Sequence, residues 1–419
     1  MKQTILTFLT KVKPDRVSEL RELLDEIGTD VEHNPYIPYL DLKLLHFSSL
    51  VLSDDPEYGP YLVFENNFDG TLDPYLDDLY AHAAEGLHRI YRCCIDYPAT
   101  NAGDKDRLLS YLRAHVRHPN AYHIGNVGRS VIRTHQEDAL RDGVEDFLDE
   151  LVRQGNVGAP STIRQKVQSY VRSQPAFAWA ANTQLRQTAM EHFLPRFKIA
   201  IAALVALILL PLLIPLAIIW IIMLRWTETH EAPPPELDVK DHVKELVKRE
   251  DRTHIVQNHM CSITTVKPSL FRRLTLRGLL WLVNLLARTS DKGELSGIPS
   301  IHFAHWSLID NGRRLLFVSN FDGSWENYLD DFIDKASTGL TAIWSNTLGF
   351  PKTSWLVREG ARDGSRFKAN ARDKQTFTNV WYSAYKPLTV QTIDNNSQIR
   401  DDMFNTLDET ATRDWVRRF

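Results

Sequence analysis

The stretch YLVFENNFDGTLDPYLDDL at residues 61–79 returns in similar form as RLLFVSNFDGSWENYLDDF at residues 314–332. Each copy joins an apolar run to an Asn-Phe-Asp-Gly turn and then to a Tyr-Leu-Asp-Asp segment. Residues 62–98 and 315–351 align without a gap, and fifteen of the 37 aligned residues are identical. Similarity of this extent within one chain indicates duplication of a structural unit.

The repeat extends in both directions from this turn. Val-Lys-Pro occurs at residues 12–14 and again at 266–268, and Leu-His-Phe at 45–47 matches Ile-His-Phe at 301–303. The apolar spacing predicts the order strand, helix, strand, strand, helix, strand in each copy. This order is ferredoxin-like. We therefore expect an α+β fold in which two βαββαβ units pair sheet to sheet.

The duplication divides the 419-residue chain into five predicted parts. The two ferredoxin-like units, the second with a C-terminal helix, are residues 1–152 and 253–419. Between them the sequence predicts an amphipathic helical connector, a membrane-inserted helical segment and a charged, proline-containing linker, at residues 153–195, 196–226 and 227–252 respectively.

The central segment is the strongest single signal for a membrane. Residues 199–224 contain no charge, and a straight helix at about 1.5 Å per residue would exceed the roughly 30 Å hydrocarbon core. Pro211 and Pro215 in its middle predict a bend, and hence a hairpin that returns to the same face. A single span stays open, because spanning helices tolerate proline.

Charge and cysteine content bear on location and partners. The net charge is −4 without an overall basic field, which excludes nucleic acid as a partner. Three cysteines form no disulfide framework, and the N-terminus lacks the apolar run of a signal peptide. We expect both units on the cytoplasmic face of a membrane, and a homo-oligomer stays open.

Two further stretches favour contact with a lipid bilayer. Residues 270–288 predict a basic amphipathic helix, with Arg272, Arg273, Arg277 and Trp281, that suits anionic headgroups; packing of this helix on the sheet is the alternative. The RAHVRHPNAYH stretch at residues 113–123 offers histidines at helical spacing for a metal. A basic surface cluster near anionic lipid is the interpretation that we favour.

Most of the duplicated turn has a structural explanation. Thr71 and Ser324 are expected to cap helices, Asp73 and Glu326 to complement the helix dipoles, and the glycines to adopt positive φ. The polar residues beyond this need are the candidate catalytic residues Asn67, Asn320, Asp69 and Asp322. Asp before Gly also commonly stabilises its own turn.

His46 and His302 are the second duplicated polar feature. Strict alternation places His46 on one strand face with Ser48 and Leu50, and Phe47 on the other. If Phe47 and Phe303 pack under the helices, both histidines face a pocket between the sheets. There an imidazole can act as a base or ligate haem iron. A hydrogen-bonded structural histidine is the alternative.

The βαββαβ units with a strand ending in Val-Lys-Pro resemble the dimeric α+β-barrel superfamily, which includes monooxygenases, chlorite dismutases and dye-decolourising peroxidases. The Asn-Phe-Asp-Gly-Thr stretch is similar to the distal Asp-Gly-Thr motif of those peroxidases, whose Asp assists peroxide cleavage. The chain departs from it at Asn66, where the motif begins with Gly, and no matching distal arginine or proximal histidine is identified.

This resemblance implies a membrane-associated oxidoreductase, of peroxidase or monooxygenase type, that acts on a lipophilic small molecule, with haem as the candidate cofactor at His46 and His302. The alternative is a non-catalytic lipid-binding or scaffold protein of a membrane complex. The absence of a recognisable catalytic constellation in the sequence favours this alternative.

Overall fold

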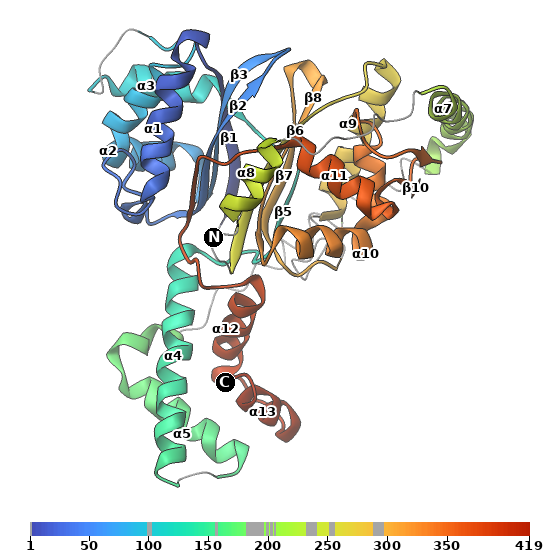
Figure 1. Ribbon diagram of the computed structural model, residues 1–419. Helices are drawn as coiled ribbons and strands as arrows, with labels where there is room; N and C mark the ends of the chain where they lie inside the picture. The colour runs from blue at the N-terminus through green and yellow to red at the C-terminus, as the bar shows by residue number, and fades with distance from the viewer. Residues whose placement is uncertain are drawn as a thin grey trace.

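The chain forms a mixed α+β fold around two antiparallel five-stranded sheets, as the computed structural model shows (Figure 1). The structure describes residues 2–98, 103–155, 158–181, 207–231, 241–250, 256–287 and 297–419, and residues 197, 201 and 204. The first sheet has the order β12-β2-β3-β1-β4 and the second the order β11-β6-β8-β7-β5.

The strands are short at the sheet edges and long in the middle. The first sheet consists of β1 (Gln3–Lys11), β2 (Leu45–Asp55), β3 (Gly59–Asp69), β4 (Val116–Arg117) and β12 (Val380–Ser383). The second consists of β5 (Ala121–Ile124), β6 (Gln257–Thr265), β7 (Ile301–Ile309), β8 (Arg314–Asp322) and β11 (Gln375–Thr376). Read from opposite ends, the two orders place equivalent strands at equivalent positions, with β2 matching β7, β3 matching β8 and β1 matching β6, as the duplication predicts.

Each half of the chain lends one edge strand to the other half. β5 pairs with β7 of the second sheet, and β12 pairs with β2 of the first, both antiparallel. The predicted units at residues 1–152 and 253–419 are therefore interlocked by strand exchange. The inner faces of the two sheets also pack together, through a buried cluster that contains Val51 and Val63 from one sheet and Leu316 and Val318 from the other.

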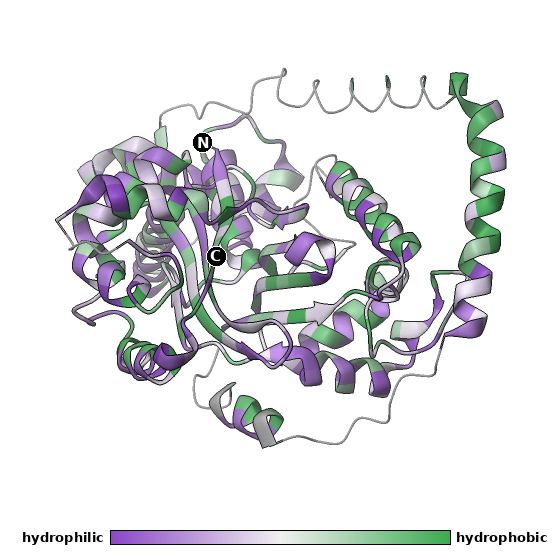
Figure 2. Cartoon of the chain, turned by 90° about the horizontal axis from the view of Figure 1, so that it is seen from above, coloured by the Kyte–Doolittle hydropathy of each residue, from purple (hydrophilic) through white to green (hydrophobic). Residues whose placement is uncertain are grey.

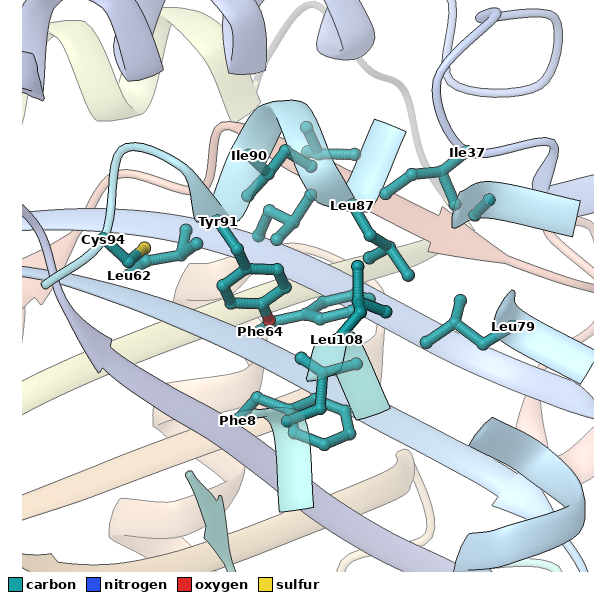
Figure 3. Packing of buried hydrophobic residues seen from close by; sticks show 14 of the residues in the cluster. Phe8, Ile37, Leu62, Phe64, Leu79, Leu87, Ile90, Tyr91, Cys94 and Leu108 are labelled. Carbon is teal, nitrogen blue, oxygen red and sulfur yellow. The ribbon is translucent and has the colours of Figure 1, made fainter. Parts of the chain in front are cut away.

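Helices cover the outer face of each sheet. On the first sheet lie α1 (Val17–Thr29), α2 (Leu72–Tyr91) and α3 (Lys105–Ala114). Their apolar stripes pack on strand residues such as Phe8 and Phe64, and Figure 3 shows Leu79, Leu87 and Leu108 in this core. On the second sheet lie α9 (Leu270–Ala287), α10 (Trp325–Trp344) and α11 (Gly364–Lys374).

A separate helical layer lies below both sheets in Figure 1. It consists of α4 (Val131–Arg153), α5 (Pro160–Ser173), α12 (Val390–Met403) and α13 (Glu409–Val416), which share a buried cluster around Trp415. Helices α4 and α12 are the two copies of one element, and each begins directly below its own sheet. The remaining described helices are α7 (Leu210–His230) and α8 (Asp241–Glu250).

The described part of the central segment is the long helix α7. It has 21 residues, and among the described residues it is the helix that is long and apolar enough to cross a membrane. Pro211 lies in its first turn and Pro215 lies inside it, where the helix continues without a break. Most of the first limb of the predicted hairpin falls outside the described residues, and so do residues 232–240 and 251–252 of the predicted linker.

Helix α7 exposes apolar side chains along most of its length, which Figure 2 shows as a green helix standing beside the rest of the molecule. Leu212, Leu216 and Ile219 are each more than half exposed. Only its last turns dock on the protein: Leu224 is buried, and Trp220 donates to the Thr275 hydroxyl at 3.0 Å. An exposed apolar surface of this extent is typical of a protein interaction site or of contact with a membrane.

The two predicted helix caps differ. The Ser324 hydroxyl accepts from the backbone N–H of Asn327 at the start of α10. Thr71 occupies the same position before α2, but its hydroxyl makes no cap hydrogen bond. The prediction of two equal caps is therefore wrong for Thr71. The third residue of α2 is Pro74, which has no N–H to donate.

Candidate functional site

The two duplicated histidines lie between the sheets, but not by the alternation that the sequence suggests. The pairing of β2 with β3 shifts register between Leu45 and Phe47, and β7 has the same irregularity between Ile301 and Phe303. The extra residue in each strand puts histidine and phenylalanine on the same face.

The predicted placement of the phenylalanines is therefore wrong. Phe47 and Phe303 pack against each other between the sheets, with ring centroids 5.7 Å apart, and not under the helices. Beyond the bulge, Leu50 belongs to the core beneath the helices, so it does not share a face with His46. His46 contacts the Phe303 ring and His302 contacts the Phe47 ring.

The duplicated aspartates join these histidines to the lower helices. One oxygen of Asp69 lies 3.1 Å from His46 Nε2, and the other accepts the backbone N–H of Val131 at 2.8 Å. Asp322 repeats this arrangement with His302 at 2.7 Å and Val390 at 2.8 Å. Each carboxylate thus accepts a hydrogen bond at the positive end of α4 or α12, where a negative charge is stabilised.

The two copies differ in the hydrogen-bond partner of the histidine Nδ1 atom. His46 Nδ1 lies 2.9 Å from the hydroxyl of Tyr385, which follows the exchanged strand β12. Because Asp69 requires a donor at Nε2, Nδ1 accepts from Tyr385. Burial raises the pKa of Tyr385 well above its ordinary value, which keeps this donor protonated. In the second copy, His302 Nδ1 is buried without a hydrogen-bond partner.

A second polar group lies at the centre of the interface and was not predicted. Glu65 on β3 is fully buried, and its carboxylate lies 3.3 Å from His259 Nε2 and 3.7 Å from His305 Nδ1, which belong to the second sheet. Asn67 and Asn320 both donate to Glu65, at 2.8 and 3.2 Å. The predicted candidates Asn67 and Asn320 therefore serve this carboxylate.

The outer atoms of this cluster are also hydrogen-bonded. Ser49 donates to Glu65 at 3.2 Å, and Trp381 donates to the side-chain oxygen of Asn320 at 2.9 Å. The far ring nitrogens of the two histidines lie close to threonine hydroxyls, His259 Nδ1 at 2.9 Å from Thr378 and His305 Nε2 at 3.1 Å from Thr7. The polar cluster around Glu65 therefore links the two sheets, including the exchanged strand β12 of the first sheet.

The protonation states follow from burial and from these partners. Burial acts to raise the pKa of Glu65, but the hydrogen bond and charge of His259 outweigh it, and the pKa lies below its ordinary value. Burial lowers the pKa of His305 to about 4 despite the nearby carboxylate. Glu65 is thus an ionised carboxylate beside a neutral His305 at neutral pH.

Haem does not fit the residues that the sequence nominates for it. Both ring nitrogens of His46 and Nε2 of His302 are engaged, and the His302 ring packs on the ring of Phe47, with centroids 5.1 Å apart. Side chains fill the space between the sheets at these positions. A small apolar cavity of about 30 Å³ lies elsewhere, beneath α10 and α11.

Metal ligation is not supported for the described residues either. Within them, no group of three histidine, cysteine or carboxylate side chains has the arrangement to hold an ion. His115 and His118, the pair at helical spacing, do not form such a site. Instead, Nδ1 of His115 lies 2.8 Å from the carbonyl oxygen of Tyr111 at the end of α3.

The predicted membrane-binding residues of α9 divide between the interior and the surface. Arg272 is buried and pairs with Glu231 at the end of α7, so its predicted role at the surface is wrong. Arg277 is exposed and Arg273 is half-buried. Trp281 is 61% exposed and lies on one stripe with exposed Leu270 and Leu274.

Helix α7 is attached beside this stripe by charged side chains that are buried or half-buried. Glu228 is buried and accepts the backbone N–H groups of Trp355 and Leu356 at 2.9 and 2.7 Å. Glu231 pairs with Lys267 at 2.6 Å and with Arg272. The apolar helix therefore has a fixed attachment to the second sheet, next to the exposed face of α9.

The sequence matches no protein-family model and no curated protein. The geometry of these groups therefore carries the functional argument.

Proposed function

We propose that the chain is a non-catalytic, membrane-anchored lipid-binding protein, in which two interlocked ferredoxin-like units stand on one face of a bilayer. The observation that carries this proposal is the exposed apolar helix α7, fixed at its C-terminal end beside the exposed stripe of α9. Both surfaces match the polarity of a bilayer and its interface.

The candidate catalytic residues support this choice because they are engaged in structural contacts. Asp69 and Asp322 fix the first turns of α4 and α12, and Asn67 and Asn320 bind the carboxylate of Glu65. A catalytic group must reach a substrate. Asn67, Asn320 and Asp69 are buried and Asp322 is 11% exposed, and all four are hydrogen-bonded to other groups of the protein instead.

The strand exchange supports a same-side arrangement in the membrane. Because β5 and β12 cross between the sheets, the two units cannot lie on opposite sides of a bilayer. Two complete helical crossings need roughly 40 apolar residues, and residues 199–224 are too few. We therefore propose partial insertion from the cytoplasmic face.

Vesicle flotation of the full-length chain tests the anchor. Replacement of Leu212, Leu216 and Ile219 by glutamine should abolish flotation, because it removes apolar surface from α7. The matched control replaces Val127, Ile132 and Val152, which are exposed apolar residues outside α7 and α9. Equal flotation of both variants would refute the proposal.

The oxidoreductase expectation is the competing proposal, and the unpartnered His302 Nδ1 is the observation that favours it. It requires the aromatic cluster between the sheets to open and admit haem. Titration of the purified protein with haem would then give a Soret band that His302→Ala removes. We expect no such band.

A further inference from the structure

A groove with an excess of positive charge lies where the edges of the two sheets meet. Its volume is about 740 Å³, and it runs between β1 and β4 of the first sheet and the β7–β8 turn of the second. Lys11, His115 and Arg117 line one side, and Arg277 of α9 lines the other. The groove thus joins two basic stretches that lie far apart in the sequence.

The cations in this groove are bound by neutral groups: Arg117 donates to the carbonyl of Val116, and Lys11 lies over the ring of Tyr61. Among the described residues, Lys11, Arg117 and Arg277 form no ion pair with a carboxylate. The two groove carboxylates are Asp96 and Asp310. Asp310 accepts from Tyr61 and pairs with Arg314, which also pairs with Asp55. The three lining cations outnumber the two lining carboxylates, so the groove carries a net positive charge that attracts an anion.

The groove also has a rigid wall. Asp310 and Asn311 in the β7–β8 turn have φ of 50° and 57°, and Gly312 has φ of 80°. A Cβ on Gly312 would lie 3.1 Å from the guanidinium of Arg277. The turn and α9 therefore close against each other, and the strained backbone holds this end of the groove in place.

Arg277 connects the groove to the surface that we assign to the bilayer. On α9 it lies at helical spacing from Leu274 and Trp281, both of which are exposed. A ligand with a negative head in the groove would therefore have its apolar part beside this stripe. An amphiphile with an anionic head matches both features.

We propose that this groove binds the phosphate-bearing headgroup of an anionic phospholipid. The inference rests on the proposed membrane function and names the lipid class. Lys11, Arg117 and Arg277 would contact the phosphate. Leu274 and Trp281 would contact the acyl region, as amphipathic surfaces do at an interface.

The test compares flotation of the full chain on phosphatidylcholine vesicles with flotation on phosphatidylcholine mixed with phosphatidylglycerol. Each cation near an anionic surface contributes about fivefold in binding, so the combined variant Lys11→Gln, Arg117→Gln, Arg277→Gln should lose about a hundredfold preference for mixed vesicles. The control removes the same charge elsewhere, as Arg21→Gln, Arg153→Gln, Arg417→Gln, and should keep the preference. Circular dichroism and melting of both variants verify their folding.

The outcomes separate this inference from the proposed function. Loss of binding to all vesicles in the α7 variant, together with a groove variant that still binds vesicles but no longer prefers the mixed ones, supports both. Binding of the wild type to neutral and mixed vesicles with equal affinity overturns the groove inference and leaves the anchor intact. Displacement from mixed vesicles by glycerol 3-phosphate at constant ionic strength would identify a soluble phosphate ester and overturn the lipid assignment.

Discussion

At the scale of single residues, Glu65 is the group on which the interface depends most. It is a fully buried carboxylate that accepts hydrogen bonds from Ser49, Asn67 and Asn320. In the duplicate its position is occupied by Val318. One copy thus supplies the charge, and the other supplies the two histidines.

Replacement of Glu65 by leucine should destabilise the protein by about 3–5 kcal/mol, because it leaves the buried donors and His259 without their acceptor. Glu65→Gln keeps an acceptor oxygen and should cost less. Denaturant unfolding of the full chain in detergent measures both values. Equal stability of Glu65→Leu and the wild type would show that the network contributes nothing.

His305 should make the fold sensitive to acid. The unfolded chain takes up a proton at the ordinary pKa of 6.5 and the folded chain at about 4, so protons bind preferentially to the unfolded state between these values. Stability should therefore be complete above pH 6.5 and fall by about 3 kcal/mol as the pH drops towards 4. Melting temperatures across this range measure it.

The control for this pH dependence is a second histidine substitution. His305→Asn should flatten the slope between pH 6.5 and 4, whatever its effect at neutral pH. His118→Asn removes an exposed histidine and should leave the slope unchanged. An identical slope in all three proteins would place the acid sensitivity elsewhere.

At the scale of elements, the duplicated aspartates decide how the lower helices begin. Asp69→Asn and Asp322→Asn remove the charge at the first N–H of α4 and α12, and each should cost about 1–3 kcal/mol. Asp77→Asn alters an exposed carboxylate on α2 and should cost less than about 0.5 kcal/mol. Amide hydrogen exchange should become faster in the first turn of α4 for Asp69→Asn and of α12 for Asp322→Asn. The control Asp77→Asn should leave the exchange rates of both helices unchanged.

The attachment of α7 is a second prediction about an element. Glu228→Ala removes the acceptor of the N–H groups of Trp355 and Leu356, of which the second is buried, and these two residues already have positive φ. Limited proteolysis should therefore cut residues 353–359 several times faster than in the wild type. Asp334→Ala, an exposed position on α10, should be cut at the wild-type rate.

At the scale of the whole molecule, strand exchange makes the two halves depend on each other. Residues 1–181 and 207–419 produced together should form a stable one-to-one complex, because each sheet needs an edge strand from the other half. A second half that ends before β12 should give no soluble complex. Purification by a tag on one half measures the association.

The sequence predicts the duplication well, because the repeat retains identical residues at the turn. It does not predict the strand exchange. Strands β5 and β12 have only four residues each, and nothing in their sequences indicates whether they pair with β2 or with β7. The predicted strand face of Phe47 is wrong because a β-bulge interrupts the alternation of side chains along the strand, and no distinctive residue in the sequence marks the bulge.

The candidate site was predicted in part for similar reasons. Asn67, Asp69 and His46 stand out because they are polar and repeated. Glu65, His259 and His305 have no identical counterpart in the other copy, so a comparison of the two copies does not identify them. A charged residue inside the apolar run LVFENN was the available signal for Glu65.

The exchanged strand also affects the order of events during synthesis. The edge of β2 stays unpaired until β12 is made, roughly 320 residues later, or about half a minute at roughly 10 residues per second. The apolar segment leaves the ribosome in this interval. The nascent chain therefore meets the bilayer with its first sheet still open, and a chaperone that shields the β2 edge during translation would raise the yield of folded protein.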